Sequence, residues 1–297
     1  MTKPTLTIAV IGDVHDQWQE EDHQALKHLG VDLVLFVGDF GNESVEIVRA
    51  IAKIDIPKAV ILGNHDAWYS ASDWGKSKSP YDHKTEDRVQ KQLDLLGETH
   101  VGYGYLDFPD LNLSVVGARP FSWGGEEWKN GDFLRDRYGI HGFAESTQRI
   151  IESAKQTAYN TVLLLSHNGP TGLGDRDYNP CGKDWQPVGG DHGDPDFAEA
   201  IAAIYELPKA VPFATFGHMH HKLRNNTRLR EAIAVNDRGT VFLNAASVPR
   251  IVQKLDGCHR NFSLVQLTAG QVTQISLVWL DPTFQIKSEQ VLYSRPL

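Results

Sequence analysis

Cysteine is scarce in this chain: Cys181 and Cys258 are the only two among 297 residues, and they form no CxxC pair. Neither a disulfide framework nor a thiolate metal site is therefore indicated, and a reducing compartment is favoured. No apolar run approaches the roughly 20 residues that a membrane helix needs. The first residues, MTKPTLTIAVIGD, lack the charged leader and long apolar stretch of a signal peptide. We therefore expect a soluble, cytoplasmic protein without a membrane partner.

An excess of basic residues is also missing. The 29 Lys and Arg are outnumbered by 38 Asp and Glu, which gives a net charge of −9 and a pI near 5.8. Binding to a nucleic-acid backbone depends on a basic surface, so we expect no nucleic-acid partner. The single basic cluster, with four basic residues from Lys222 to Arg230, is predicted to be a solvated loop.

The composition is otherwise that of an ordinary globular protein, with 41% hydrophobic and 23% charged residues. A chain of this length can bury a sizeable core. The sequence contains no internal repeat and no low-complexity linker, which predicts a single domain over residues 1–297.

Apolar runs alternate with helical stretches in the first hundred residues, and this βαβαβ order predicts a parallel sheet with right-handed crossovers. The predicted strands are 6–11, 31–37 and 58–62, the helices are 18–29, 42–53 and 85–96, and segment 67–84 is predicted to be irregular. Later in the chain we predict a hairpin over 101–117, helices at 144–158 and 196–206, strands at 161–165 and 212–216, and a strand-rich end. The expected fold class is α/β, with two mixed sheets packed face to face and helices outside, in four layers.

Five of the apolar runs end in Gly, Ser or Asp and continue with metal-binding residue types. The strings are Asp13-Val14-His15, Gly38-Asp39, Gly63-Asn64-His65-Asp66, Ser166-His167-Asn168 and Gly217-His218-Met219-His220. In α/β sheets, sites are built at the carboxyl ends of strands. Each string alone has an ordinary explanation, such as a helix cap, a turn or a hydrogen-bonded core histidine. Five such strand ends in one chain instead indicate a metal site.

In order and spacing, these strings resemble the calcineurin-like metallophosphoesterase superfamily across residues 13–220. The strings GDFGNE and SHNGPTGLGD resemble a cyanobacterial and plastid branch of it. The resemblance implies an αββα sandwich with two metal ions at the sheet edge. It also implies their ligands, which would be Asp13, His15 and His220 for one ion, Asn64, His167 and His218 for the other, and Asp39 for both. By the same resemblance, His65 would stand beside the reacting phosphate and Asp66 would orient it.

These residue types suit the chemistry independently of the family. Two divalent ions about 3.5–4 Å apart repel each other, and a shared carboxylate such as Asp39 reduces that repulsion. Because Asp13 is the only other carboxylate ligand, a net charge of about +2 remains to attract phosphate. A bridging hydroxide can then attack phosphorus in line, while His65 protonates the departing oxygen. Nitrogen and oxygen ligands without sulfur favour Mn, Fe, Zn, Co or Ni, with manganese preferred.

Several features bear on the substrate. Protein serine/threonine phosphatases of the superfamily read GDxVDRG and GNHE where this chain has GDFGNE and GNHD, which disfavours that branch. Segments 67–84, 119–143 and 168–195 are predicted insertions on the site face, and they contain five of the seven Trp. These indoles either pack the loops onto the body or form an aromatic pocket for a small organic phosphate. Arg119 and Arg250 are candidate phosphate clamps, with a surface or structural role as the alternative.

We therefore predict a dinuclear metal-dependent hydrolase that acts on a small phosphomonoester. A phosphodiesterase for nucleotide or other diesters is the enzymatic alternative. The other alternative is a non-catalytic metal-binding scaffold, which the loss of His65 or of a metal ligand would mark. His65 and all seven ligand positions are present, which favours the enzyme.

Overall fold

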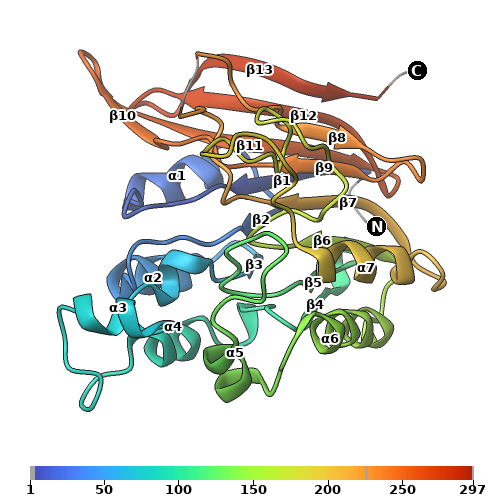
Figure 1. The fold of residues 1–297 in the computed structure, drawn as a ribbon. Coiled ribbons are helices and arrows are strands. Elements are labelled where there is room, and N and C mark those ends of the chain that lie inside the picture. Colours follow the sequence, from blue (N-terminus) through green and yellow to red (C-terminus); the bar gives the residue numbers. More distant parts are fainter. Residues whose placement is uncertain (1–3, 225–226, 296–297) are drawn as a thin grey trace.

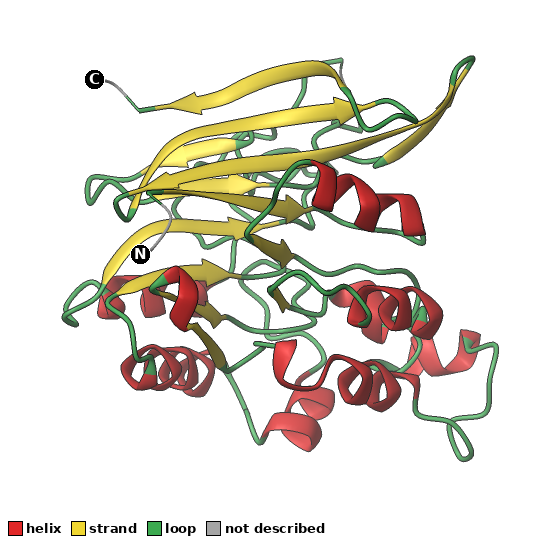
Figure 2. Ribbon diagram, turned by 180° about the vertical axis from the view of Figure 1, so that it is seen from behind, coloured by secondary structure: helices red, strands yellow, loops and turns green. Residues whose placement is uncertain are grey.

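The computed structural model describes residues 4–224 and 227–295, which form two mixed β-sheets flanked by helices (Figure 1). The two sheets pack face to face, and helices cover their outer faces. Seen from behind, the long C-terminal strands lie on the side of the molecule away from most of the helices (Figure 2). This arrangement confirms the predicted α/β sandwich. Among the described residues, no helix is long and apolar enough to cross a membrane.

The first sheet combines the N-terminal strands with the C-terminal ones. It has seven strands in the order β13-β12-β11-β1-β2-β3, with β10 paired to β11. Their bounds are β1 (Thr5–Ile11), β2 (Leu33–Phe36), β3 (Lys58–Val60), β10 (Ile251–Lys254), β11 (Gly257–Thr268), β12 (Gln271–Leu280) and β13 (Ile286–Ser294). Strands β1, β2 and β3 are parallel, as predicted, and β11 runs antiparallel to β1.

The second sheet is formed by the middle of the chain. It has six strands in the order β4-β5-β6-β7-β9-β8. Their bounds are β4 (Tyr105–Phe108), β5 (Leu113–Gly117), β6 (Thr161–Leu165), β7 (Ala210–Phe216), β8 (Ile233–Val235) and β9 (Val241–Asn244). The four inner strands are parallel, and the edge strands β4 and β8 are antiparallel to their neighbours. The predicted hairpin over 101–117 is the β4–β5 pair.

Seven α-helices are described. They are α1 (Glu20–His28), α2 (Val45–Ala52), α3 (Asp73–Lys78), α4 (Arg88–Leu96), α5 (Gly131–Tyr138), α6 (Phe143–Gln156) and α7 (Pro195–Ile204). Short 3₁₀ turns lie at Asn64–Ala67, Gly97–Thr99 and Pro109–Leu111. Helix α2 shows why these segments are helical: Val48 and Ile51, three positions apart, are buried on one stripe that faces the first sheet.

Alternation along each strand divides the apolar side chains between the layers. In β1, Ile8 and Val10 join the core between the two sheets, whereas Ala9 and Ile11 face the helices. In β6, Leu163 faces the inter-sheet core and Leu164 packs under α6 and α7. Because both faces of these strands are buried, their sequences are unbroken apolar runs, which is why they were predictable.

The sequence did not predict strands β8, β10 and β13 or helices α3 and α5. Strand β13 is an edge strand in which seven of nine residues are exposed, so its sequence carries no apolar alternation, and it is held by backbone pairing with β12. Helices α3 and α5 lie within segments 67–84 and 119–143, and each buries a single residue. A helix that buries so little of its surface leaves no amphipathic signal in the sequence.

Candidate metal centre

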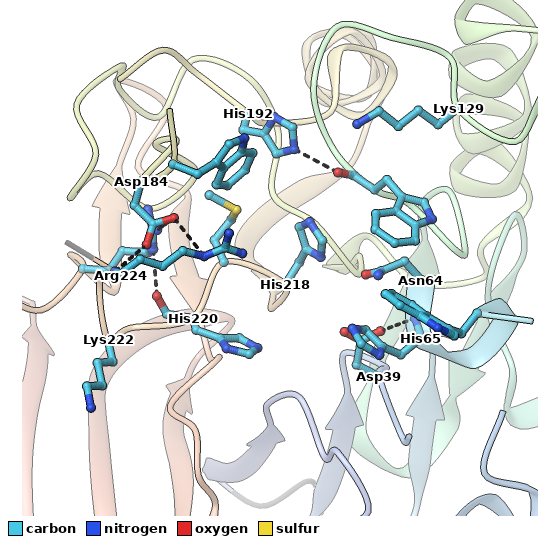
Figure 3. Close-up of a pocket in the computed structure, with 15 residues that line it drawn as sticks. Asp39, Asn64, His65, Lys129, Asp184, His192, His218, His220, Lys222 and Arg224 are labelled. Atoms are coloured by element: carbon cyan, nitrogen blue, oxygen red, sulfur yellow. Dashed lines mark hydrogen bonds and ion pairs between the residues drawn. The ribbon is translucent and has the colours of Figure 1, made fainter. Parts of the chain in front are cut away.

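The five strings of metal-binding residue types follow β1, β2, β3, β6 and β7. Strands β1, β2 and β3 are parallel to one another in the first sheet, and β6 and β7 are parallel in the second, so their carboxyl ends meet at one edge of the sandwich (Figure 1). The structure therefore brings together side chains that are up to two hundred positions apart in the sequence. Figure 3 shows Asp39, Asn64, His65, His218 and His220 around one cavity.

One group of possible ligand atoms comes from Asp13, His15 and His220, whose atoms lie within 4.8 Å of one another. The Nε2 atoms of His15 and His220 are 3.1 Å apart. His220 Nε2 also lies 3.1 Å from Asp13 Oδ2. This is the set that was predicted to hold the first ion.

A second group comes from Asp39, His167 and His218, again with atoms within 4.8 Å of one another. Asn64 joins it, because its Oδ1 lies 2.9 Å from His167 Nε2. Asp39 also forms a group with His15 and His65. The Asp39 carboxylate therefore lies between the two predicted ion sites.

The second group fits a cation because of where its lone pairs point. His167 Nδ1 lies 2.7 Å from the Val37 carbonyl oxygen, so Nδ1 carries the proton of the neutral ring and Nε2 presents a lone pair. Nε2 in turn faces Asn64 Oδ1 and, at 3.3 Å, Asp39 Oδ1. In this neutral tautomer, three lone-pair atoms face one another, and a divalent ion would satisfy all three.

The first group also fits a cation. Asp13 is fully buried, and its Oδ2 faces His220 Nε2 at 3.1 Å. Burial raises the pKa of Asp13, but His220 and the neighbouring histidines bring it below its ordinary value. In the first group, burial lowers the pKa of His220, but Asp13 raises it above its ordinary value. In the second group, burial lowers the pKa of His218, and His167 lowers it further. An ionised carboxylate and neutral imidazoles are the protonation states that metal ions bind.

The backbone around these ligands is close-packed and strained. A Cβ on Gly63 would lie 2.3 Å from Asp39 Oδ1, and one on Gly217 would lie 2.1 Å from Asp13 Oδ1, so only glycine fits at either position. His15, Asp39 and His218 have left-handed φ values of 43°, 53° and 63°. Strain of this kind costs about 1–3 kcal/mol per residue and clusters where function requires it.

The structure corrects the role predicted for Asp66. Its carboxylate does not contact the His65 ring but accepts the backbone N–H groups of Gly63, Asp39 and Phe40, at 2.7 to 2.9 Å. Asp66 therefore holds the loops after β2 and β3 together. The partner of the His65 ring is Asn42, whose Oδ1 lies 2.6 Å from Nδ1. Sequence analysis missed Asn42, although it lies within the GDFGNE string.

The two arginines proposed as phosphate clamps are also corrected. Arg119 is 2% exposed, and its donors bind Asp194 at 2.7 Å and Asp196 at 2.9 Å. Arg250 is 1% exposed and donates to the carbonyl oxygens of Gln17 and Asn261. Both side chains are structural, because burial removes them from substrate and each is held by hydrogen bonds within the protein.

We expect Arg119→Met to reduce stability rather than substrate binding. Removing the guanidinium leaves Asp194 and Asp196 as uncompensated buried carboxylates, which costs about 3–5 kcal/mol. Urea unfolding with a fluorescence readout measures the loss. A variant with unchanged stability and a ten-fold higher KM for p-nitrophenyl phosphate would restore the clamp role.

The ligand groups open onto a cavity of about 450 Å³. Its wall includes four basic side chains that were not predicted to line the site, namely Lys129, Lys222, Arg224 and Arg230. Figure 3 labels the first three. Lys222 and Arg224 belong to the basic cluster predicted to be a solvated loop. Both are exposed, but they lie at the rim of the cavity because the segment directly follows His220. The short distance in sequence from His220 was the signal that could have predicted their place at the cavity.

The three predicted insertions meet at this cavity. Each contributes one indole to the wall: Trp68 from 67–84, Trp123 from 119–143 and Trp185 from 168–195. The other two Trp of the insertions do not, since Trp74 is 58% exposed and Trp128 packs on Arg119 and Phe143. Three of the five indoles therefore line the cavity, and the other two do not.

Buried charged side chains anchor two of these insertions. Glu43 accepts the backbone N–H groups of Tyr69 and Ser70 and the hydroxyl of Tyr81. Arg230 donates to three carbonyl oxygens, those of Asp177, Asn179 and Gly182. The segments that carry Trp68 and Trp185 are thereby fixed to the body of the protein.

Comparison with known proteins agrees with this geometry. The family model described as calcineurin-like phosphoesterase matches residues 6–222. No curated protein matches the chain. Among solved structures, TT1561 of Thermus thermophilus is similar, with a TM-score of 0.51, 10% identity, and coverage of 97% of this chain and 100% of that one. A dimetal phosphatase from Danio rerio has a TM-score of 0.50 and 12% identity, with 99% of this chain and 100% of that chain covered.

At these identities the two structures show a common fold, and the match to the family model carries the assignment. The resemblance predicted from the five strings is confirmed. The chain belongs to the calcineurin-like phosphoesterase family and is a metal-dependent phosphoric ester hydrolase.

Proposed function

We propose that this protein is a phosphatase that hydrolyses a small phosphomonoester with two divalent metal ions. The observation that carries the proposal is the shared cavity, in which Asp39, Asn64, His65, His218 and His220 lie at one end and cations lie along the rim. The cavity has the volume of a site for one small organic molecule.

Asp13, His15 and His220 would hold one ion, Asn64, His167 and His218 the other, and Asp39 both. The donor set of imidazoles, carboxylates and an amide suits Mn, Fe, Zn, Co or Ni, and we expect Mn. When bound, the two ions lower the pKa of water so that it can attack phosphorus, and they offset charge on the phosphoryl oxygens.

His65 is the residue placed to assist the leaving group. Asn42 engages Nδ1, which leaves Nε2 as the ring atom available to the cavity. In the imidazolium form, Nε2 can hand its proton to the departing ester oxygen, which leaves a neutral ring with its proton on Nδ1. Burial lowers the pKa of His65, and Asn42 is a neutral partner that does not reverse this shift. We therefore expect this proton to matter most for alcohols that leave poorly.

The cations at the rim favour a monoester over a diester. Near neutral pH a phosphomonoester carries a charge of about −1.5 to −2, whereas a diester carries only one negative charge. Lys129, Lys222 and Arg224 add positive charge beside the metal ligands on a chain whose net charge is −9. Local positive charge of this kind attracts the more highly charged substrate.

The test compares p-nitrophenyl phosphate with bis(p-nitrophenyl) phosphate on protein loaded with Mn. We expect kcat/KM to be at least ten-fold higher for the monoester, with metal content measured on the same preparation. A preference for the bis-ester would favour the phosphodiesterase. A preparation that binds two ions per chain and cleaves neither ester would favour the scaffold.

We expect Asn42→Ala to lower kcat about ten-fold while the bound metal stays in place. Losing the 2.6 Å contact frees the His65 ring to rotate, and misplacing a catalytic group by about 1 Å can cost up to a hundred-fold in rate. Steady-state kinetics with parallel metal analysis measures the effect. Asn42→Asp keeps an acceptor and should recover most of the rate, whereas equal damage from both variants would contradict the positioning role.

A further inference from the structure

Building on the proposed phosphatase function, we infer that the organic part of the substrate carries a planar aromatic ring that stacks on an indole wall beside His65. We define the indole wall as Trp68 and Trp123. The substrate class that fits is a nucleoside monophosphate, with the phosphoryl group at the metal ligands and the base at the wall.

The wall begins where the leaving group departs. The Trp68 ring stacks on the His65 ring with a centroid distance of 4.5 Å and an interplanar angle of 16°. Trp123 follows at 5.4 Å from Trp68, tilted by 31°. The three rings form a row that leads from the site of bond cleavage along the cavity. The organic part of a bound ester therefore lies against aromatic surface as soon as it leaves the phosphoryl group.

The facing side of the cavity is also built for a flat group. Trp185 meets the edge of His192 at 4.7 Å, and the Arg224 guanidinium lies 5.3 Å from its ring. His192 Nε2 donates to the Trp123 carbonyl oxygen at 2.9 Å, which ties the two sides together (Figure 3). Two separate insertions are thus held at a fixed spacing, and an aromatic ring gains most from stacking against such a rigid site.

The wall is not a product of core packing. Trp18 shows what packing looks like here: it is 7% exposed and contacts Phe36. Trp68, Trp123 and Trp185 are only partly buried, and all three line a cavity. Three partly exposed indoles around one cavity are typical of a binding site.

Charge and size complete the match. Within the described residues, Lys129 and Lys222 have no carboxylate partner, so their charge is available to the phosphate of an entering ligand. Asp184, the acid in the wall besides Asp39, already lies 3.7 Å from Arg230 Nη2. A volume of about 450 Å³ accommodates a base, a sugar and one phosphate.

The experiment compares the four common ribonucleoside 5′-monophosphates with ribose 5-phosphate, which has the same phosphoryl group and no base. We expect the best nucleotide to exceed ribose 5-phosphate at least ten-fold in kcat/KM. In Trp123→Ala this ratio should fall about ten-fold, since stacking on an aromatic side chain contributes on the order of 1–3 kcal/mol per base. Trp279→Ala, in a partly buried indole of β12 outside the cavity, is the matched control and should leave the ratio as it is.

The inference would be overturned if ribose 5-phosphate were turned over as well as every nucleotide. An equal fall of the ratio in Trp279→Ala would also overturn it. Failure of the proposed function looks different, because the protein would then cleave neither p-nitrophenyl phosphate nor any member of the panel. If the protein cleaves none of these esters, equilibrium dialysis with the four nucleosides still tests whether the aromatic-ring site exists. Binding that weakens ten-fold in Trp123→Ala supports the ring site, and absence of binding to the parent protein rejects it.

Discussion

Asp39→Asn is expected to lower kcat about a thousand-fold and to reduce the metal content below two ions per chain. The side chain lies between the two ligand groups, and its Oδ1 also accepts the His65 backbone N–H at 2.8 Å. An amide keeps the shape but loses the negative charge, so the repulsion between two divalent ions is no longer offset. Electrostatic stabilisation by a metal pair is worth several kcal/mol, which corresponds to this loss of rate.

The measurement is kcat with p-nitrophenyl phosphate alongside plasma emission analysis of bound metal. Asp110→Asn is the control, because Asp110 is exposed and lies between β4 and β5, at the opposite edge of the sheet. Near-normal turnover with two ions per chain in Asp39→Asn would show that this carboxylate does not serve both sites.

His65→Ala is expected to lower kcat by about 10²–10⁴ with both metal ions retained. His65 contacts His15 ring to ring at 4.9 Å but belongs to neither of the two ligand sets. Its loss should therefore leave the ions in place and remove the proton for the leaving group. The damage should be smallest for p-nitrophenyl phosphate, whose leaving group departs without a proton, and largest for glycerol phosphate.

The exposed His141→Ala serves as the control for loss of an imidazole. The proton-donor role depends on the difference between the two substrates. An equal fall for both leaving groups would assign His65 to phosphate binding instead. A fall that accompanies loss of metal would make it a ligand.

The sequence predicted the sandwich and drew attention to the candidate metal ligands for one physical reason. Strands buried on both faces must be apolar throughout, so a polar string such as Gly63-Asn64-His65-Asp66 at a strand end stands out against its surroundings. The chain order of these strings then distinguished a metal site from five separate turns. Strand β13 lacked this contrast because it is polar and exposed.

Partners in space were not predictable in the same way. Arg119 follows a strand just as the ligand strings do, yet it pairs with Asp194 and Asp196, more than seventy positions further along the chain. Asp66 is adjacent to His65 in sequence, but its side chain turns to the backbone of the β2 loop and leaves His65 to Asn42. Residues that are close in sequence are candidates for a contact, but the direction in which each side chain points determines which contacts form.

Each predicted ion would draw its ligands from both sheets. Asp13 and His15 follow β1 of the first sheet and His220 follows β7 of the second, and the other group divides in the same way. Metal loading is therefore a cross-link between the halves of the sandwich. Metal affinity and the packing of the two sheets are then thermodynamically linked. A large-to-small substitution deep in the inter-sheet core, far from any ligand, would therefore weaken metal binding as well as the fold.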